Sequence, residues 1–275
     1  MAANLDGKSV IITGAANGVG RETARRFAAA GARVVLADRE ESDLRAIAAQ
    51  INDDGGQAVA FPCDLTASLT ASNLMAATLD AWDRVDVLVN GARTVMSGGM
   101  METDSDALSE MFDINVRATF RLSQAVARRM IVQREDAMRD GAEESARAHA
   151  GAIVNITSIS ARRTLPELLH YSVSCAALDQ LTRSMAVALA PHRVRVNAVA
   201  LGSVMTRNLR EALRDHAELR ARMTAVTPLG RVGESGEAAD AVVFLSSDLA
   251  SFITGQILAV DGGRTMLDPL AIPVM

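Results

Sequence analysis

The stretch SVIITGAANGVG, residues 9–20, decides the fold. Its first five residues are mostly apolar and β-branched, which predicts a buried strand. The glycine-rich turn from Gly14 to Gly20 follows, and residues 21–30 have helical composition. Strand, glycine turn and helix in this order form a phosphate site, because glycines let the backbone approach a pyrophosphate and the helix N-terminus presents free N–H groups. A tight turn without a ligand is the alternative for this stretch taken alone.

A second predicted strand, Arg33 to Ala37, ends at Asp38. An acid at this place can accept both hydroxyls of an adenosine ribose and would repel a 2′-phosphate, which favours NAD over NADP. The adjacent Arg39 complicates this prediction, because a guanidinium could pair with such a phosphate. An exposed helix start, where acids favour the helix dipole, is the alternative role for Asp38.

Similar apolar runs continue along the chain, separated by stretches of helical composition. They lie at residues 58–62, 85–89, 152–157, 193–198 and 256–260. The alternation predicts one α/β domain over residues 1–275 with a mainly parallel sheet. No repeat or linker interrupts it.

Composition limits the classes of function. The 275 residues carry a net charge of −5 with scattered Lys and Arg, which gives no footprint for nucleic acid. No apolar run reaches the roughly 18 residues of a membrane span, and the N-terminus does not resemble a secretory signal. The two cysteines, Cys63 and Cys175, do not make a disulfide framework. We expect a cytoplasmic protein that binds neither nucleic acid nor membrane, without a metal site.

The segment from Ser158 to Cys175 carries the chemistry. Ser158 ends an apolar run, and Tyr171, the single tyrosine of the chain, opens a pattern of helical period. A serine at the carboxyl end of a strand and a tyrosine on the first turn of the next helix can face one cleft. Together with the glycine spacing T-G-x-x-x-G-x-G, which includes Thr13, this segment resembles the short-chain dehydrogenase/reductase family. In that family a lysine stands four residues after the tyrosine, whereas this chain has Cys175.

The resemblance covers nearly the whole chain and implies a doubly wound, Rossmann-like sheet of seven strands. It implies that Gly14, Asn17, Gly18, Val19 and Gly20 hold the pyrophosphate and nearby ribose. It further implies that the rest of the cofactor lies against Asp38, Asp64, Leu65, Asn90, Gly91, Ala92, Tyr171, Val204 and Thr206. For Asp64 the alternative is an ordinary helix N-cap, formed by Asp64 or Thr66.

Departures from the family pattern gather near the active site. The family pattern D-x-L-V-N-N-A-G reads DVLVNGAR here, so that Gly91 replaces an asparagine and Arg93 replaces a glycine. Asn115, within FDINV, matches the active-site asparagine of the family, which bends its helix and holds a water. A residue tolerated in mid-helix is the alternative for Asn115.

In relatives the tyrosine moves a proton at the substrate oxygen and the serine hydrogen-bonds that oxygen. The lysine holds the nicotinamide ribose and lowers the pKa of the tyrosine. Free tyrosine titrates near 10, and a nearby cation typically lowers such a pKa by roughly 1–3 units. Cys175 cannot supply that charge, because a thiol is neutral or negative.

Three interpretations follow. The first is an active oxidoreductase that transfers a hydride between NAD(P) and an alcohol or ketone, with Arg93 as the replacement cation and Arg163 or His170 as weaker candidates. The second is a pseudoenzyme that binds NAD without turnover. The third makes Cys175 a catalytic or redox thiol. The intact Ser158, Tyr171 and Asn115 favour the enzyme.

Other segments bear on assembly and specificity. Because relatives are mostly tetramers or dimers, we expect a homotetramer or homodimer. The polar stretch 133–150 is predicted to be a solvated helical extension at the edge away from the ligand crevice, and residues 208–224 a helical flap. Specificity is expected to lie in loops 93–101, 162–169 and 205–225, whose Met and Leu residues indicate an apolar pocket.

Overall fold

A seven-stranded sheet forms the centre of the molecule, whose computed structural model describes residues 5–102, 104–141, 149–214 and 216–268. The strands lie in the order β3-β2-β1-β4-β5-β6-β9, and each neighbouring pair is parallel. Their bounds are β1 Ser9–Thr13, β2 Arg33–Asp38, β3 Gln57–Pro62, β4 Val87–Asn90, β5 Gly151–Ser158, β6 Val194–Leu201 and β9 Ile257–Val260. Strand order reverses between β1 and β4. The predicted doubly wound single domain is therefore confirmed.

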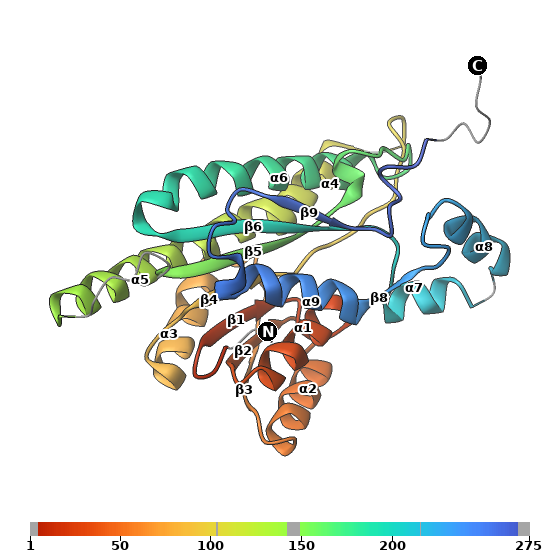
Figure 1. The fold of residues 1–275 in the computed structure, drawn as a ribbon. Helices are drawn as coiled ribbons and strands as arrows, with labels where there is room; N and C mark the ends of the chain where they lie inside the picture. The colour runs from red at the N-terminus through yellow and green to blue at the C-terminus, as the bar shows by residue number, and fades with distance from the viewer. Residues whose placement is uncertain (1–4, 103, 142–148, 215, 269–275) are drawn as a thin grey trace.

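Helices cover both faces of the sheet (Figure 1). One face carries α1 (Gly18–Ala29), α2 (Glu41–Asp53) and α9 (Ser235–Ser246), and the other carries α3 (Thr70–Trp82), α5 (Thr119–Arg139) and α6 (Leu169–Leu189). Successive residues of a strand serve opposite faces, so Ile11 packs with the second group of helices and Ile12 with the first. Because both faces are covered, β1, β4 and β5 are buried along their whole lengths.

The helical segment that carries Asn115 is not a single regular helix. α4 (Ser105–Phe112) passes into a π-helical turn, Asp113–Ala118, and then into α5. Asn115 lies in that wider turn, and such turns inside helices are frequent at functional sites. α5 continues to Arg139, which confirms a helical extension for the first part of the stretch 133–150. Residues 142–148 lie outside the described residues.

The predicted flap consists of two short helices, α7 (Arg207–Ala212) and α8 (Ala217–Ala225). They project beyond the sheet, and none of the described side chains of α8 is buried (Figure 1). Two short parallel strands, β7 (Val204–Met205) and β8 (Gly233–Glu234), pair at the base of the flap. The sequence did not predict this pair, because strands of two residues are too short to show alternation.

Parallel strands bring their carboxyl ends to one edge of the sheet. Thr13 of β1 lies in register with Ala37 of β2 and with Asn90 of β4, and Asn90 lies in register with Asn155 of β5. The glycine turn, Asp38 and Ser158 all follow or end strands at this edge. The topology therefore gathers the residues that the sequence singled out.

Candidate active site

The glycine turn between β1 and α1 packs closely against the turn after β4. Gly14 has a φ of 70°, and a Cβ on it would lie 2.6 Å from the carbonyl carbon of Gly91. The Thr13 hydroxyl oxygen accepts hydrogen bonds from the N–H groups of Gly91 at 3.1 Å and Ala92 at 3.2 Å. A Cβ on Gly20 would overlap the Gly14 carbonyl oxygen. These glycines are required because two backbone turns meet without room for side chains.

The start of α1 offers free backbone donors. Its N-cap residue, Asn17, makes no side-chain capping bond, and the first turn contains no acidic residue. Uncapped N–H groups with a partial positive charge favour an anion at this position. Gly18, with a φ of 55°, faces the Thr206 methyl, which would lie 3.1 Å from an added Cβ. An uncapped, acid-free helix start behind a glycine turn fits the pyrophosphate of a dinucleotide.

Asp38 is fixed at the end of β2 beside that turn. Its carboxylate accepts hydrogen bonds from the N–H of Ala16 at 3.0 Å and the N–H of Glu40 at 3.1 Å. The Arg39 side chain is 73% exposed and pairs with Glu40 at 3.5 Å. The negative charge of Asp38 therefore lies next to the glycine turn, whereas the guanidinium of Arg39 pairs with the adjacent Glu40.

Asp64 forms a local turn after β3. Its Oδ1 accepts hydrogen bonds from the hydroxyl of Thr66 at 2.7 Å and the N–H of Thr66 at 2.8 Å, and these bonds lower the pKa of Asp64. The alternative of a helix N-cap is wrong, because α3 begins only at Thr70 with Leu69 before it. Leu65 is partly buried against the core below.

Tyr171 lies on the first turn of α6, and only 5% of it is exposed. Burial raises the pKa of the phenol, and the Arg93 guanidinium acts in the opposite direction. Cys175 also raises this pKa, whereas the hydroxyl of Ser158, the last residue of β5, lowers it. The Ser158 hydroxyl is itself held by the N–H of Ser160 at 3.1 Å. The structure thus brings Ser158 and Tyr171 together.

Arg93, in the turn after β4, is the positive group beside Tyr171. Its Nη1 donates to the Tyr171 hydroxyl at 3.0 Å and to the Thr157 carbonyl at 3.3 Å. A guanidinium keeps its proton at any relevant pH, so this charge is permanent. The weaker candidates lack this contact: Arg163 donates to the Thr265 carbonyl, and the buried Nδ1 of His170 has no hydrogen-bond partner among the described residues.

Asn115 anchors the chain next to Arg93. Its Oδ1 accepts from the N–H of Thr94 at 2.9 Å, and its Nδ2 donates to the Thr94 carbonyl at 3.0 Å and to the Ser174 hydroxyl at 3.1 Å. Sequence reasoning missed Ser174. Its position three residues after Tyr171 on a helix was the available signal, because residues at that spacing share a face.

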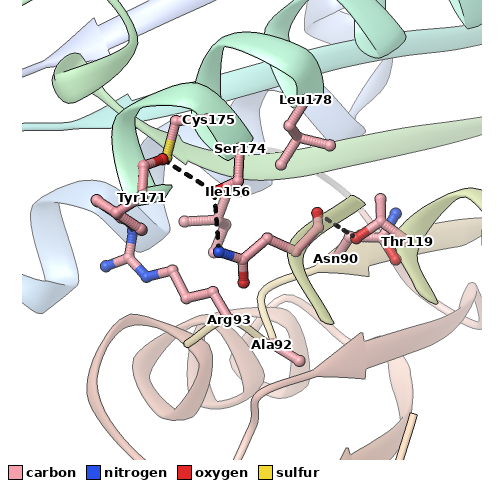
Figure 2. A pocket seen from close by; sticks show the side chains of 10 residues that line it. Asn90, Ala92, Arg93, Thr119, Ile156, Tyr171, Ser174, Cys175 and Leu178 are labelled. Carbon is pink, nitrogen blue, oxygen red and sulfur yellow. Dashed lines mark hydrogen bonds between the residues drawn. The ribbon is translucent and has the colours of Figure 1, made fainter. Parts of the chain in front are cut away.

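Cys175 is 4% exposed and packs against Met111 and Tyr171. It lines a small cavity of about 10 Å³, room for about one water, together with Arg93 and Asn115. Figure 2 shows Arg93, Tyr171 and Cys175 in the wall of this cavity. Burial raises the pKa of the thiol, while its hydrogen bond with Tyr171 acts in the opposite direction. A protonated, buried thiol gives no support to a catalytic or redox role for Cys175.

The other predicted cofactor residues lie at the same edge of the sheet, where their side chains make different structural contacts. The amide of Asn90 donates to Asn155 at 2.8 Å and to Ser123 at 3.0 Å, so its side chain ties strands together. Val204 is buried at the base of the flap, and Thr206 caps α7 by accepting from the N–H of Leu209 at 3.2 Å. Thr206 therefore joins the flap to the glycine turn.

Among the described residues, no three or more His, Cys, Asp or Glu side chains are grouped so that they could hold a metal ion. The helices of the described ranges include none that is long and apolar enough to cross a bilayer.

A doubly wound sheet with a glycine turn and an acid-free helix start at its switch point, and a buried phenol near a serine, is typical of dinucleotide-dependent oxidoreductases. The family model described as Enoyl-(Acyl carrier protein) reductase matches residues 14–265. The chain belongs to the short-chain dehydrogenase/reductase family of NAD(P)-dependent oxidoreductases.

Three relatives illustrate the similarity. L-rhamnose 1-dehydrogenase (NAD(P)(+)) of Azotobacter vinelandii is 37% identical over 93% of this chain and 96% of its own. The crystal structure of a short-chain type dehydrogenase/reductase from Mycobacterium marinum has a TM-score of 0.85 at 32% identity, covering 96% of this chain and 98% of that one. The structure of 7α-hydroxysteroid dehydrogenase with NADH and 7-oxo glycochenodeoxycholic acid has a TM-score of 0.84 at 35% identity, covering 94% and 95%.

Proposed function

We propose that this enzyme uses NAD to interconvert an alcohol and the corresponding ketone, with Arg93 as the cation that Cys175 cannot provide. The observation that carries the proposal is the 3.0 Å hydrogen bond from Arg93 to the Tyr171 hydroxyl. The nicotinamide would accept the hydride in oxidation and donate it in reduction.

Tyr171 takes the proton from the substrate hydroxyl during oxidation and returns it during reduction. Its burial opposes ionisation, so a neighbouring positive charge is needed for the phenolate to form near neutral pH. Arg93 supplies that charge from the turn after β4. Ser158 hydrogen-bonds the substrate oxygen, and Asn115 keeps the segment with Arg93 in place.

The lysine of the family would project from α6 at Cys175, toward the cavity that Cys175 and Arg93 now line. In this enzyme the positive charge comes from the opposite wall instead. A positive charge therefore still lies beside the phenol, but the residue that carries it is in the turn after β4 and not on α6. This geometry favours the enzyme over the silent NAD binder.

The cofactor would lie along the carboxyl edge of the sheet. Its pyrophosphate and nearby ribose would be held by Gly14, Asn17, Gly18, Val19 and Gly20. Its remaining contacts would come from Asp38, Asp64, Leu65, Asn90, Gly91, Ala92, Tyr171, Val204 and Thr206. NAD is preferred over NADP because the fixed carboxylate of Asp38 would repel a 2′-phosphate.

The proposal also covers the oligomeric state, the substrate class and the cellular location. Exposed apolar side chains on α5 and α6, Phe120, Val132, Val173 and Val187, support a homodimer or homotetramer built through these helices. The substrate is a small-molecule alcohol or ketone, and the panel of candidates starts from the compounds named for relatives, L-rhamnose and 7-oxo glycochenodeoxycholic acid. A cytoplasmic location remains a prediction from composition.

Calorimetric titration with NADH and NADPH, followed by turnover on an alcohol and ketone panel across pH, tests the proposal. We expect tighter binding of NADH, measurable turnover in the wild type, and loss of turnover with retained NADH binding in Tyr171→Phe. Binding without any turnover would favour the pseudoenzyme. Failure to bind either dinucleotide would overturn the proposal.

A further inference from the structure

An ion pair joins the flap to the start of α2, the helix that follows β2 and Asp38. The Arg207 guanidinium, on the first residue of α7, lies 2.7 Å from the carboxylate of Asp43, in the first turn of α2. The two residues are 164 positions apart in the chain. The contact therefore exists only because the fold brings the flap over the start of α2.

The chain next to this pair also touches α1. Thr206, directly before Arg207, has its methyl against Gly18 at the start of α1. α1 and α2 follow the neighbouring strands β1 and β2, and Asp38 ends β2 between the two helix starts. Thr206 and Arg207 thus form a short bridge, with one end on α1 and the other on α2. The glycine turn and Asp38, proposed to hold the pyrophosphate and the adenosine ribose, adjoin these two helix starts.

We infer that the Arg207–Asp43 ion pair holds this bridge closed over the dinucleotide and slows the release of the cofactor. The inference rests on the proposed function. α8, the outer helix of the flap, has no buried side chain among its described residues, whereas Leu213, directly after α7, is buried, so the described part of the flap is held through α7, where Arg207 lies. Arg207 and Asp43 are positioning residues, because they act on the cofactor through the chain segment that they hold.

The size of the effect follows from exposure. The side chains are 50% and 39% exposed, and exposed ion pairs contribute little, so breaking this one should raise the release rate by about two- to fivefold. The effect should fade at high salt, because the Debye length falls from about 10 Å at 0.1 M to about 3 Å at 1 M. A change of that size is measurable by the fluorescence of released NADH.

The test measures NADH release by stopped-flow displacement in wild type, Asp43→Asn, Arg207→Gln and the double variant. We expect each single variant to release NADH about two- to fivefold faster at low salt and the double variant to match the singles, since both remove one interaction. The ratio of variant to wild-type release should approach one at about 1 M salt.

Glu41→Gln is the matched control. It removes one negative charge from the same turn of α2 and breaks the exposed Arg45–Glu41 pair at 2.8 Å, which does not reach the flap. Its release rate should equal that of the wild type. Amide hydrogen exchange of α7, measured without cofactor, tests independently whether the ion pair restrains the flap. The exchange rate should be higher in Asp43→Asn than in the wild type and unchanged in Glu41→Gln.

Equal release rates in Asp43→Asn and Glu41→Gln, or strictly additive effects in the double variant, would overturn the inference and leave the proposed function intact. If the wild type bound no NADH, the proposed function would fail and the role of the bridge with it. Altered α7 exchange with unchanged NADH release would also overturn the inference, because the bridge would then be structural alone.

Discussion

Arg93 and Tyr171 are 78 residues apart in the chain, and the guanidinium donates a 3.0 Å hydrogen bond to the phenolic oxygen. Burial makes the phenolate of Tyr171 costly, and the adjacent permanent charge offsets part of that cost. The two residues come from opposite walls of the site, the turn after β4 and the first turn of α6.

Removal of Arg93 should disable alcohol oxidation near neutral pH. The phenolate is the base, and loss of the cation raises the pKa of Tyr171. The apparent pKa at which the rate increases with pH should therefore rise by roughly 1–3 units. At pH 7 the Arg93→Ala variant should lose about ten- to a thousandfold in kcat/KM. pH–rate profiles with saturating NAD provide the measurement, with Arg139→Ala as a control for the loss of an arginine elsewhere.

Addition of Cys175→Lys to Arg93→Ala should restore part of the rate, because the charge would then come from α6. An unchanged profile in Arg93→Ala would show that Arg93 is not the replacement cation. Recovery in the double variant would show in addition that only the charge was missing.

Asn115→Leu should destabilise the protein and lower turnover together. The N–H and carbonyl groups of Thr94 would lose their partners, at a cost of about 1–3 kcal/mol for each group left unsatisfied. Asn115→Asp keeps the acceptor for the N–H of Thr94 but loses the donor to its carbonyl. Its free energy of unfolding should therefore lie between those of the wild type and Asn115→Leu. Urea denaturation of the three proteins tests this order, and equal stability would contradict the anchoring role.

Neither cysteine should react quickly in the native protein at pH 7.5. Burial is the main cause that raises the pKa of Cys63 to about 11, and burial also raises that of Cys175. A thiol with a pKa near 11 is only about 0.03% thiolate at this pH, and the thiolate is the reactive form. Iodoacetamide labelling followed by mass spectrometry should find slow modification in the native state and two labelled thiols in urea. Rapid labelling of Cys175 with loss of activity, preserved in Cys63→Ser, would restore the thiol interpretation.

Gly91→Ala should lower stability although the family pattern has an asparagine there. A Cβ at this position would lie 2.6 Å from the carbonyl oxygen of Thr13, and accommodation of such overlap typically costs about 1–3 kcal/mol. Gly233→Ala is a matched control, because the nearest atom to its added Cβ is at 3.6 Å. Similar melting temperatures for the two variants would show that the turns after β1 and β4 separate readily.

Much of the fold could be predicted from local patterns. Buried strands such as β1 and β5 appear in the sequence as continuous apolar runs, because helices cover them on both faces. The Gly14–Gly20 turn was equally visible, since glycines are required where two backbones meet. Irregularities within the helical segments were harder to predict. The π turn around Asn115 and the break between α7 and α8 depend on packing that local composition does not encode.

The sequence by itself determined the order of the strands and helices, the position of the glycine turn, and the loss of the usual lysine at Cys175. It also named Arg93 as a replacement, though only through resemblance. The tertiary structure alone decided that Arg93 reaches Tyr171, that Arg163 turns to Thr265, and that Arg207 pairs with Asp43. The physical reason is that charge–charge contacts act over a few ångströms, and a separation of 78 or 164 residues in the chain fixes no distance until the sheet has formed.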